Sequence, residues 1–479
     1  MTNLTEFLFD KNKNNASKIA FVDNTKTITY YELEQSTRLA ATWMVDQQIG
    51  HGDRVVIALY DNIETVVCFL ATMLIGATAV MVNPRTKRDK LNYQINYVSP
   101  KIILAESTLI ESQAIDTSIP IFSADHMMVQ SSCLNEYSLL STTKPTDVAY
   151  MVWTSGTTGH AKAVMHCHSR MISSAERNIF NLLAEDKNYP TIKLFFAYGI
   201  FMLVATLAVG AESYLDSEIF NPAKVRRILT TYNPTKFYSV PVIYRELIVE
   251  DSAINLPAKC YSAGDKLPDV LRSKWHRYSQ QQIYNCMGSS ELNCFFINYA
   301  GTNSSLGTVV DGYDARIVDN NYCVVPHGQI GTLQVKSNNC AVGYFNDEKW
   351  SKKTFKEWIS TGDLCYQDDS GYFWYLGRDS EIIKINGQYI SPNELEESLL
   401  NFQGVQQAAV LSKSGKDDID TIEAFVVPIK DVTLNLIKLK QWMFSKHEKH
   451  SCPKIIHIMD DLPRTDTGKL ERYKLKNII

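Results

Sequence analysis

The chain has 479 residues, of which 45% are hydrophobic and 21% are charged, with a formal net charge of -4. One hydrophobic core does not organise a chain of this length, so we expect two or more globular domains. Balanced charge without a basic run argues against nucleic acid or an anionic membrane as a main partner. The ten cysteines include no Cys-x-x-Cys pair and no secretory leader pattern opens the chain, which predicts a cytoplasmic protein with reduced thiols.

In the first half of the chain, short apolar runs alternate with longer segments of helical character. Residues 55–59, 79–82 and 101–104 have the composition of buried strands. Residues 66–82 and 194–211 approach the length of a membrane span, but glycine and threonine interrupt both, so we expect buried helix and strand there. The alternation predicts an α/β fold, with a large N-terminal domain of layered α/β subdomains.

The pattern changes twice in the second half. Between about residues 305 and 345, short strands with Gly and Asn turns, such as 315–318 and 331–336, predict a small β-barrel-like subdomain. A further α+β domain of about one hundred residues is predicted by four elements: strands at 382–385, 407–411 and 423–427 and a helix at 392–400. We therefore divide the chain into domains of residues 1–379 and 380–479.

The segment Trp153-Thr-Ser-Gly-Thr-Thr-Gly-His-Ala-Lys162 has the composition of a phosphate-binding loop. Its glycines let the backbone approach a polyphosphate, and Lys162 supplies a counter-charge. The spacing is not that of a Walker loop, in which glycine directly precedes the lysine. An ordinary turn rich in glycine and threonine would explain the segment if it stood alone. The candidate phosphate contacts are Thr154, Ser155, Gly156, Thr157, Thr158, Gly159 and Lys162.

Further motifs follow this segment in a fixed order: Gly288-Ser-Ser-Glu291, Ser360-Thr-Gly-Asp363, Gly377-Arg378 leading to Lys384-Ile-Asn-Gly387, and Pro463-Arg-Thr-Asp-Thr-Gly-Lys469-Leu. Two more precede it, Thr29-Tyr-Tyr-Glu-Leu33 and Gly52-Asp-Arg-Val-Val56. Together they make almost the whole chain resemble the adenylate-forming superfamily of acyl-CoA synthetases, peptide-synthetase adenylation domains and luciferases. The resemblance implies an N-terminal domain that binds AMP and the acyl group, and a mobile C-terminal lid that carries a catalytic lysine.

The resemblance also implies a two-step reaction. A carboxylate is a poor electrophile, because its charge repels nucleophiles and oxide is a poor leaving group. In this superfamily the acid attacks the α-phosphate of ATP to give an acyl-AMP and pyrophosphate, and a thiol then displaces AMP. The implied cofactors are ATP, Mg²⁺ and coenzyme A.

Motif by motif, the resemblance assigns roles to polar residues. Lys469 would stabilise the charge that develops at the α-phosphate, although an exposed lysine near the chain end is the alternative. Glu291 would bind the metal ion beside Ser290, which replaces the usual threonine. Asp363 would accept hydrogen bonds from the ribose hydroxyls, and Arg378 would be a second nucleotide contact. Alone, these last two would indicate only a turn and a surface arginine.

The remaining assignments concern the base and the acid. The turn Ser262-Ala-Gly-Asp265 would bind adenine through Gly264 and Asp265, next to Met287 and Gly288. The chain resembles benzoate and anthranilate CoA ligases in particular, in its Phe-Phe-x-Tyr-Gly pattern, its Asn83-Pro84 junction and the aliphatic Met287. This implies an aromatic acid as substrate, although aromatic side chains also serve simple packing. The implied acyl pocket consists of Ala197, Tyr198, Gly199 and Ser262.

The thiol acceptor is expected to be a separate molecule, because no Gly-Gly-x-Ser carrier signature follows Lys469. Free CoA is the default in the superfamily, with Lys384 and Gly387 at the pantetheine tunnel. A strand-end glycine that serves a turn is an equal interpretation. A separate acyl carrier protein presents the same pantetheine arm, so it remains an alternative partner.

The sequence departs from the superfamily pattern at the phosphate loop and at the hinge. Ala161 and Ala163 replace the usual proline and glycine around the lysine. The hinge would lie at Asp379 and Ser380, where an acidic residue or lysine is usual at the second position. These changes leave open a degenerate protein that binds an adenylate or a partner without turnover. Retention of the three motif residues Lys469, Glu291 and Asp363 argues against it.

Two histidines, His166 and His168, lie two positions apart after a strand-like run. A pair of metal ligands has this spacing. Histidines of a core or a solvated surface are the favoured interpretation, because no further ligands lie nearby in the sequence.

Overall fold

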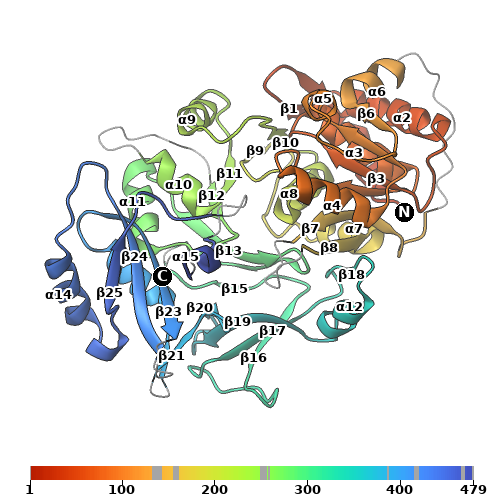
Figure 1. The fold of residues 1–479 in the computed structure, drawn as a ribbon. Coiled ribbons are helices and arrows are strands. Elements are labelled where there is room, and N and C mark those ends of the chain that lie inside the picture. Colours follow the sequence, from red (N-terminus) through yellow and green to blue (C-terminus); the bar gives the residue numbers. More distant parts are fainter. Residues whose placement is uncertain are drawn as a thin grey trace.

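The computed structural model describes residues 2–131, 143–154, 161–248, 256, 259–301, 303–385, 388–414, 420–464 and 470–476. Two large sheets and a smaller one occupy most of the chain up to residue 378, and the elements that follow form sheets of their own (Figure 1). The predicted α/β class is confirmed.

The first large sheet has a parallel centre. Its central strands carry continuous apolar runs, as in Arg54–Ala58, because both faces of a parallel sheet are buried. A strand lies at each of the places predicted at 55–59, 79–82 and 101–104, with bounds that differ by one residue. In sheet order the strands are β18 (Gly343–Tyr344), β8 (Ala163–Cys167), β7 (Val148–Trp153), β4 (Thr78–Met81), β3 (Arg54–Ala58), β5 (Ile102–Ala105) and β6 (Ile121–Ser123).

The second large sheet is parallel in its middle and antiparallel at both ends. Its strands β13 and β14 form a hairpin with its turn at residues 290–292. A hydrogen bond between Ser290 in this turn and His166 in β8 connects the hairpin to the first sheet. In sheet order the strands are β15 (Thr308–Val309), β14 (Asn293–Ile297), β13 (Ile283–Ser289), β12 (Lys259–Ser262), β11 (Lys236–Ser239), β9 (Lys187–Pro190), β10 (Glu212–Tyr214), β1 (Ile19–Val22) and β2 (Thr27–Thr29).

Helices pack around these two sheets. The two long apolar stretches fold as expected, the first as helix α3 followed by β4 and the second mainly as helix α8, and both helices are almost wholly buried. No helix in the described part of the chain is long and apolar enough to span a bilayer. The helices are α1 (Leu4–Lys11), α2 (Tyr30–Asp46), α3 (Ile63–Leu74), α4 (Arg88–Val98), α5 (Ser107–Glu111), α6 (Ala124–Ser131), α7 (His168–Glu176), α8 (Ala197–Val209), α9 (Pro222–Thr231), α10 (Pro241–Leu247), α11 (Asp269–Ser279) and α12 (Glu348–Thr354).

The opening motif at residues 29–33 has a local structural role. Glu32 N donates to the Thr29 hydroxyl at 3.2 Å and Thr29 N donates to Glu32 Oε2 at 2.9 Å. This reciprocal capping box satisfies two backbone N–H groups at the start of α2.

The small β subdomain is a four-stranded antiparallel sheet, and it extends further along the chain than residues 305–345. Its first two strands lie in that range, but the other two come from residues 359–378. The ribose motif at residues 360–363 therefore belongs to this sheet. In sheet order the strands are β16 (Asp314–Val318), β17 (Gly331–Lys336), β19 (Ile359–Gln367) and β20 (Phe373–Arg378).

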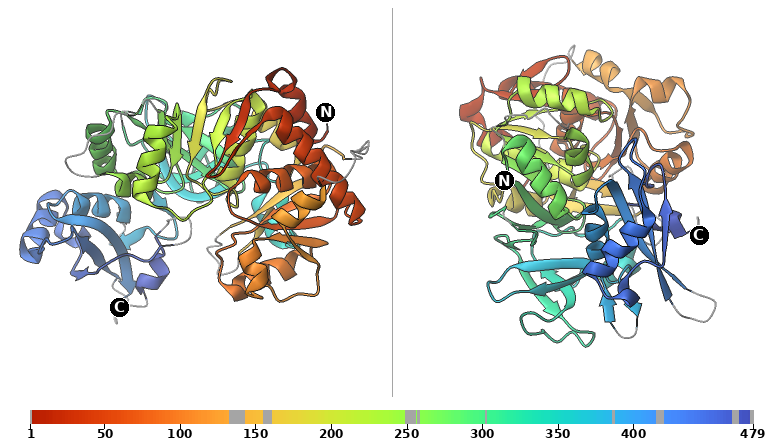
Figure 2. Two further views of the ribbon diagram at one scale, coloured as in Figure 1. Left: turned by 90° about the horizontal axis from the view of Figure 1, so that it is seen from above. Right: turned by 90° about the vertical axis from the view of Figure 1, so that its left-hand side faces the viewer.

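The elements after residue 380 gather as a lobe on one side of the molecule (Figure 2, blue). The helix predicted at residues 392–400 has those bounds, and the strands predicted at 407–411 and 423–427 are the centres of longer strands. The lobe contains β21 (Ile383–Ile385), β22 (Gln388–Ile390), α13 (Pro392–Leu400), β23 (Val405–Ser414), β24 (Asp420–Pro428), α14 (Leu436–Lys446), β25 (Ile455–Ile458) and α15 (Arg472–Lys476).

Candidate active site

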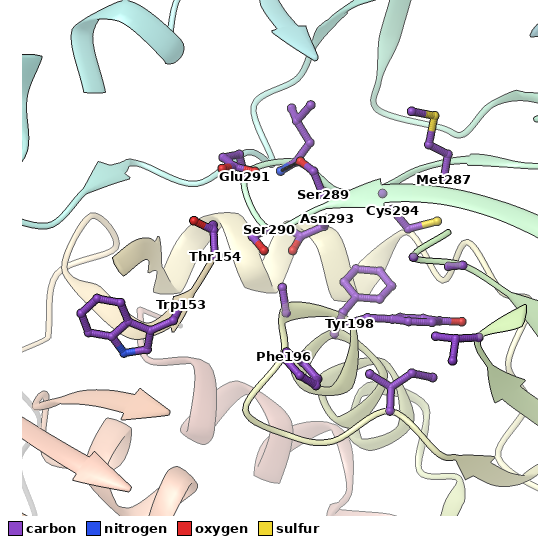
Figure 3. A pocket seen from close by; sticks show the side chains of 18 of the residues that line it. Trp153, Thr154, Phe196, Tyr198, Met287, Ser289, Ser290, Glu291, Asn293 and Cys294 are labelled. Atoms are coloured by element: carbon purple, nitrogen blue, oxygen red, sulfur yellow. Dashed lines mark hydrogen bonds between the residues drawn. The ribbon is translucent and has the colours of Figure 1, made fainter. Parts of the chain in front are cut away.

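A cavity of about 790 Å³ lies where the two large sheets and the small sheet meet. The end of β7, the start of α8, the β13–β14 hairpin and the paired strands β19 and β20 all contribute to its wall. Figure 3 shows Trp153 and Thr154 on one side, Ser290 beside Thr154 with Glu291 above, and Phe196 and Tyr198 at the start of helix α8, below the hairpin. Four motifs that lie far apart in the sequence, at residues 153–162, 288–291, 360–363 and 377–378, thus converge on one space.

One end of the cavity is polar and carries a cation. Thr154, Lys162, Ser290 and Glu291 line it, and Thr154 N donates to the Lys162 carbonyl at 3.0 Å. This hydrogen bond closes the base of the loop between β7 and β8. The predicted loop contacts Ser155, Gly156, Thr157, Thr158 and Gly159 lie outside the described residues.

The hairpin turn that carries Ser290 and Glu291 is held by hydrogen bonds from separate elements. The carbonyl of Ser290 accepts from the His166 ring at 2.9 Å, and that of Glu291 accepts from Ala341 N at 2.7 Å. The Tyr344 hydroxyl donates to Glu291 Oε1 at 3.0 Å. The carboxylate therefore has a fixed position at the polar end of the cavity.

Burial and nearby carboxylates shift the pKa of the Lys162 ammonium group in opposite directions. Burial lowers the pKa of its ammonium group below the ordinary value, while the carboxylates of Asp347 and Glu291 act in the other direction. An anionic ligand in the cavity would favour the charged form further.

The ribose motif forms an ion pair across two strands. Asp363 in β19 is the register partner of Arg378 in β20, and Arg378 Nε lies 3.0 Å from Asp363 Oδ1. Burial is the largest single influence and lowers the pKa of Arg378, but Asp363 together with the other acidic groups around it holds the pKa above its ordinary value. Both side chains line the cavity, and the buried carboxylate keeps acceptor capacity for a diol.

The wall between these groups contains two glycines that line the cavity. Gly264 has φ of +88°, a conformation that glycine adopts without strain, and Gly288 leaves no room for a side chain because a Cβ would lie 2.4 Å from the Asn293 carbonyl oxygen. Gly264, Met287 and Gly288 line the cavity. A flat group could therefore lie against backbone at this wall.

The other end of the cavity is apolar. Ala197 and Tyr198, from the first turn of α8, lie there, and burial holds the pKa of the Tyr198 phenol well above its ordinary value, so the phenol is neutral. The apolar side chains around them are Ile192, Phe201, Val240, Ile243, Ala263 and Phe295. This end suits an uncharged ring.

Three predicted contacts that the structure describes do not line the cavity. Gly199 packs against the backbone of the segment that precedes α8, where a Cβ would lie 2.2 Å from the Lys193 carbonyl oxygen. Ser262 is fully buried within β12, and Asp265 is exposed beyond the Gly264 turn. Helix and strand geometry turn Gly199 and Ser262 toward the core, so neither is a direct wall contact, and their assignment to the acyl pocket stays a prediction.

The residues assigned to the lid are partly described. Asp379 and Ser380 are exposed in the turn after β20. Lys384 lies in β21 but its side chain is outside the described part, as are Gly387 and the proposed catalytic Lys469. Their roles stay predictions.

Sequence reasoning missed several cavity residues. Trp350, Tyr344, Arg85 and Lys193 line the wall, yet none belongs to a motif that indicates this. Trp350 comes from α12, which packs beside β18 near β8. No local pattern marks such contacts, because they arise only when the strands pair.

His166 and His168 belong to the core, as the sequence favoured. His166 stacks on Tyr150 with ring centroids 4.8 Å apart, and His168 Nδ1 accepts a hydrogen bond from Leu4 N at 3.0 Å. Within the described residues no cluster of three or more His, Cys, Asp or Glu side chains could hold a metal ion. Burial lowers the pKa of each imidazole to about 4.

These two histidines predict that stability falls in mild acid. Their folded pKa of about 4 lies below the unfolded value of about 6.5, so the unfolded chain binds more protons and stability is lost as the pH falls through this window. Between pH 6.5 and pH 5 the expected loss is about 2 kcal/mol for each histidine. Urea unfolding at pH 7 and pH 5 measures it. His166→Gln, which keeps a donor for Ser290, should reduce the pH dependence, and an unchanged dependence would contradict the assignment.

Comparisons with known proteins agree with this geometry. The AMP-binding enzyme family matches residues 8–345, and the AMP-binding enzyme C-terminal domain matches residues 394–469. The chain is 30% identical to a 4-hydroxybenzoate--CoA/benzoate--CoA ligase of Rhodopseudomonas palustris, over 96% of this chain and 91% of that protein. It is 29% identical to a benzoate--CoA ligase of Thauera aromatica, over 96% and 92% of the two chains.

Among solved structures, a benzoate CoA ligase from Burkholderia xenovorans LB400 superposes with a TM-score of 0.92 at 26% identity, over 99% of this chain and 100% of that one. Both the large N-terminal part and the smaller C-terminal part of this chain therefore have counterparts in that structure. The match to the family over most of the chain, together with the convergence of its motifs on one cavity, establishes that this protein belongs to the AMP-binding enzyme family.

Proposed function

We propose that this protein is an ATP-dependent acid–thiol ligase that activates an aromatic carboxylic acid as an acyl-AMP and transfers the acyl group to CoA. The observation that carries the proposal is the single cavity, which joins a cationic, hydroxyl-bearing end to an apolar end that suits a ring. The names of the relatives, which are ligases of benzoate and hydroxybenzoate, support an aryl acid.

In the first step the acid lies with its ring at the apolar end beside Tyr198 and its carboxylate toward the nucleotide. A carboxylate oxygen attacks the α-phosphorus of ATP, the new C–O–P bond forms, and pyrophosphate leaves with the electron pair of the broken P–O bond. Lys162 and Lys469 supply the positive charge that opposes the charge gained in the transition state. We propose as ATP/AMP contacts Thr154, Ser155, Gly156, Thr157, Thr158, Gly159, Gly264, Asp265, Met287, Gly288, Ser290, Asp363 and Arg378.

The polar end of the cavity also fits Mg²⁺ bound together with ATP. Mg²⁺ is commonly held by one or two carboxylates and the phosphates of the substrate rather than by a cage of protein ligands. Glu291 offers one carboxylate there, fixed by the Tyr344 hydroxyl, with the Ser290 hydroxyl beside it. When bound, the ion neutralises phosphate charge.

For the second step we propose that residues 380–479 are a lid that rotates against residues 1–379 about Asp379 and Ser380. Lys384 in β21 and Gly387 would then border a tunnel for pantetheine. The CoA thiolate attacks the acyl carbonyl, the C–S bond forms, and AMP leaves with the electrons of the acyl–oxygen bond. An acyl carrier protein is the alternative acceptor.

The proposal is tested by pyrophosphate release from ATP and Mg²⁺ across a panel of acids, namely benzoate, hydroxybenzoates, aminobenzoates and octanoate. We expect release with one or more of the aryl acids and little with octanoate, because aromatic side chains such as Tyr198, Phe201 and Phe295 line the apolar end. Release with octanoate alone would contradict the aromatic assignment. A parallel assay with CoA or a phosphopantetheinylated carrier protein distinguishes the acceptors.

A further inference from the structure

Lys162 does not project freely into the cavity but lies against two aromatic rings. Its Nζ is 3.7 Å from the centroid of the Trp350 ring and 4.8 Å from that of the Tyr344 ring. An ammonium group within about 6 Å of a ring centroid is attracted by the negative face of the ring, most strongly for tryptophan. Both rings and Lys162 line the cavity.

The Trp350 ring has a fixed position of its own. Its side chain packs against the main hydrophobic core, and the Lys353 ammonium group also lies over the ring, 4.4 Å from its centroid. The Tyr344 hydroxyl in turn holds Glu291 at 3.0 Å. The same small cluster therefore sets the positions of the ammonium group and of the carboxylate at the polar end.

The Lys162 side chain needs a contact that orders it before a ligand binds. Ala161 leaves the backbone before the lysine without the φ restriction that a proline would impose, whereas Ala163 on the other side lies in strand β8. The lysine side chain has four rotatable bonds and loses much conformational freedom when it is ordered. A ring that holds the ammonium group before the ligand arrives reduces that loss on binding.

We propose that Trp350 is a positioning residue that acts through Lys162 on the triphosphate of ATP. The ring face holds one side of the ammonium group, and the N–H donors on its other side remain for phosphate oxygens. This inference rests on the proposed function in taking ATP as the ligand, and it assigns to Trp350 a role that no motif of the sequence indicates. Because the contact lies at the polar end, it should affect ATP and not the acid.

The test is calorimetric titration of the full-length protein with ATP and Mg²⁺. Trp350→Leu should weaken binding between about twofold and thirtyfold, the range that a cation–π contact supplies. Trp350→Phe, which keeps an aromatic face, should recover most of the affinity. Lys352→Ala, an exposed lysine of the same helix that pairs with Glu348, is the matched control and should bind like the unaltered protein.

A double-mutant cycle separates action through Lys162 from a general loss of packing. If Trp350 acts through the ammonium group, Lys162→Met and Lys162→Met/Trp350→Leu should bind ATP equally weakly. Losses that multiply in the double variant, or unchanged binding by Trp350→Leu, would overturn the inference. In steady-state assays the KM for ATP should rise by the same factor as the dissociation constant, while the KM for the acid stays unchanged.

The two proposals fail in different ways. If no acid supports pyrophosphate release but ATP binds, the proposed ligase function is wrong and the binding cycle still decides the role of Trp350. If the unaltered protein binds no ATP, both proposals are wrong.

Discussion

Lys469→Ala should lower the rate of adenylate formation by about a hundredfold to a thousandfold, the usual effect of removing a group that stabilises transition-state charge. The same variant should transfer the acyl group from supplied aroyl-AMP to CoA at nearly the unaltered rate, because we propose that the lysine leaves the site when the lid turns. Pyrophosphate release measures the first step, and thioester formation from synthetic aroyl-AMP measures the second.

The control for this variant is Lys474→Ala, since Lys474 is exposed on α15 and pairs with Glu471. It should leave both steps unchanged. Equal loss of both steps in Lys469→Ala would contradict a role confined to adenylation. The residues on the two sides of the lysine pair with each other: Glu471 N donates to the Pro463 carbonyl at 2.9 Å, and Arg464 forms a β-bridge with Leu470. The substitution should therefore not disturb the surrounding lobe.

Asp363→Ala should weaken ATP binding at least about tenfold, because the ribose would lose hydrogen bonds to a charged acceptor. Both steps should slow, since AMP occupies the site throughout. The fold should survive, because the partner Arg378 is 39% exposed and can regain water when its carboxylate is removed. Titration with ATP, and with AMP alone, measures the effect.

A matched control for Asp363→Ala is Asp369→Asn, which alters a fully exposed carboxylate in the turn of the same β19–β20 hairpin. Its affinity for ATP should be that of the unaltered protein. ATP affinity that stays the same in Asp363→Ala would rule out the ribose assignment.

Local sequence patterns predicted the elements whose signals lie within their own residues. The strands at 55–59 and 79–82 and the helix at 392–400 appear as expected, because apolar period and proline at a helix start are local signals. The extent of the small sheet was underestimated, since strands β19 and β20 join it from residues 359–378, beyond the predicted range. Pairing partners of antiparallel strands are set by tertiary packing, which the sequence pattern does not contain.

The candidate site was predicted unevenly for a similar reason. Motif residues such as Glu291, Asp363 and Arg378 line one cavity, whereas Gly199 and Ser262 lie behind its wall. A motif indicates which segment reaches a site but not which side of a helix or strand faces it. Trp350 was missed altogether, because its contact with Lys162 depends on a helix nearly two hundred residues further along the chain.

The most direct test of the central claim is mass detection of the products formed from benzoate or a hydroxybenzoate with ATP, Mg²⁺ and CoA. The proposed function predicts an aroyl-CoA thioester and AMP in equal amounts, both dependent on ATP. Formation of ADP in place of AMP, or the absence of a thioester with every aryl acid while an aliphatic acid yields one, would contradict it.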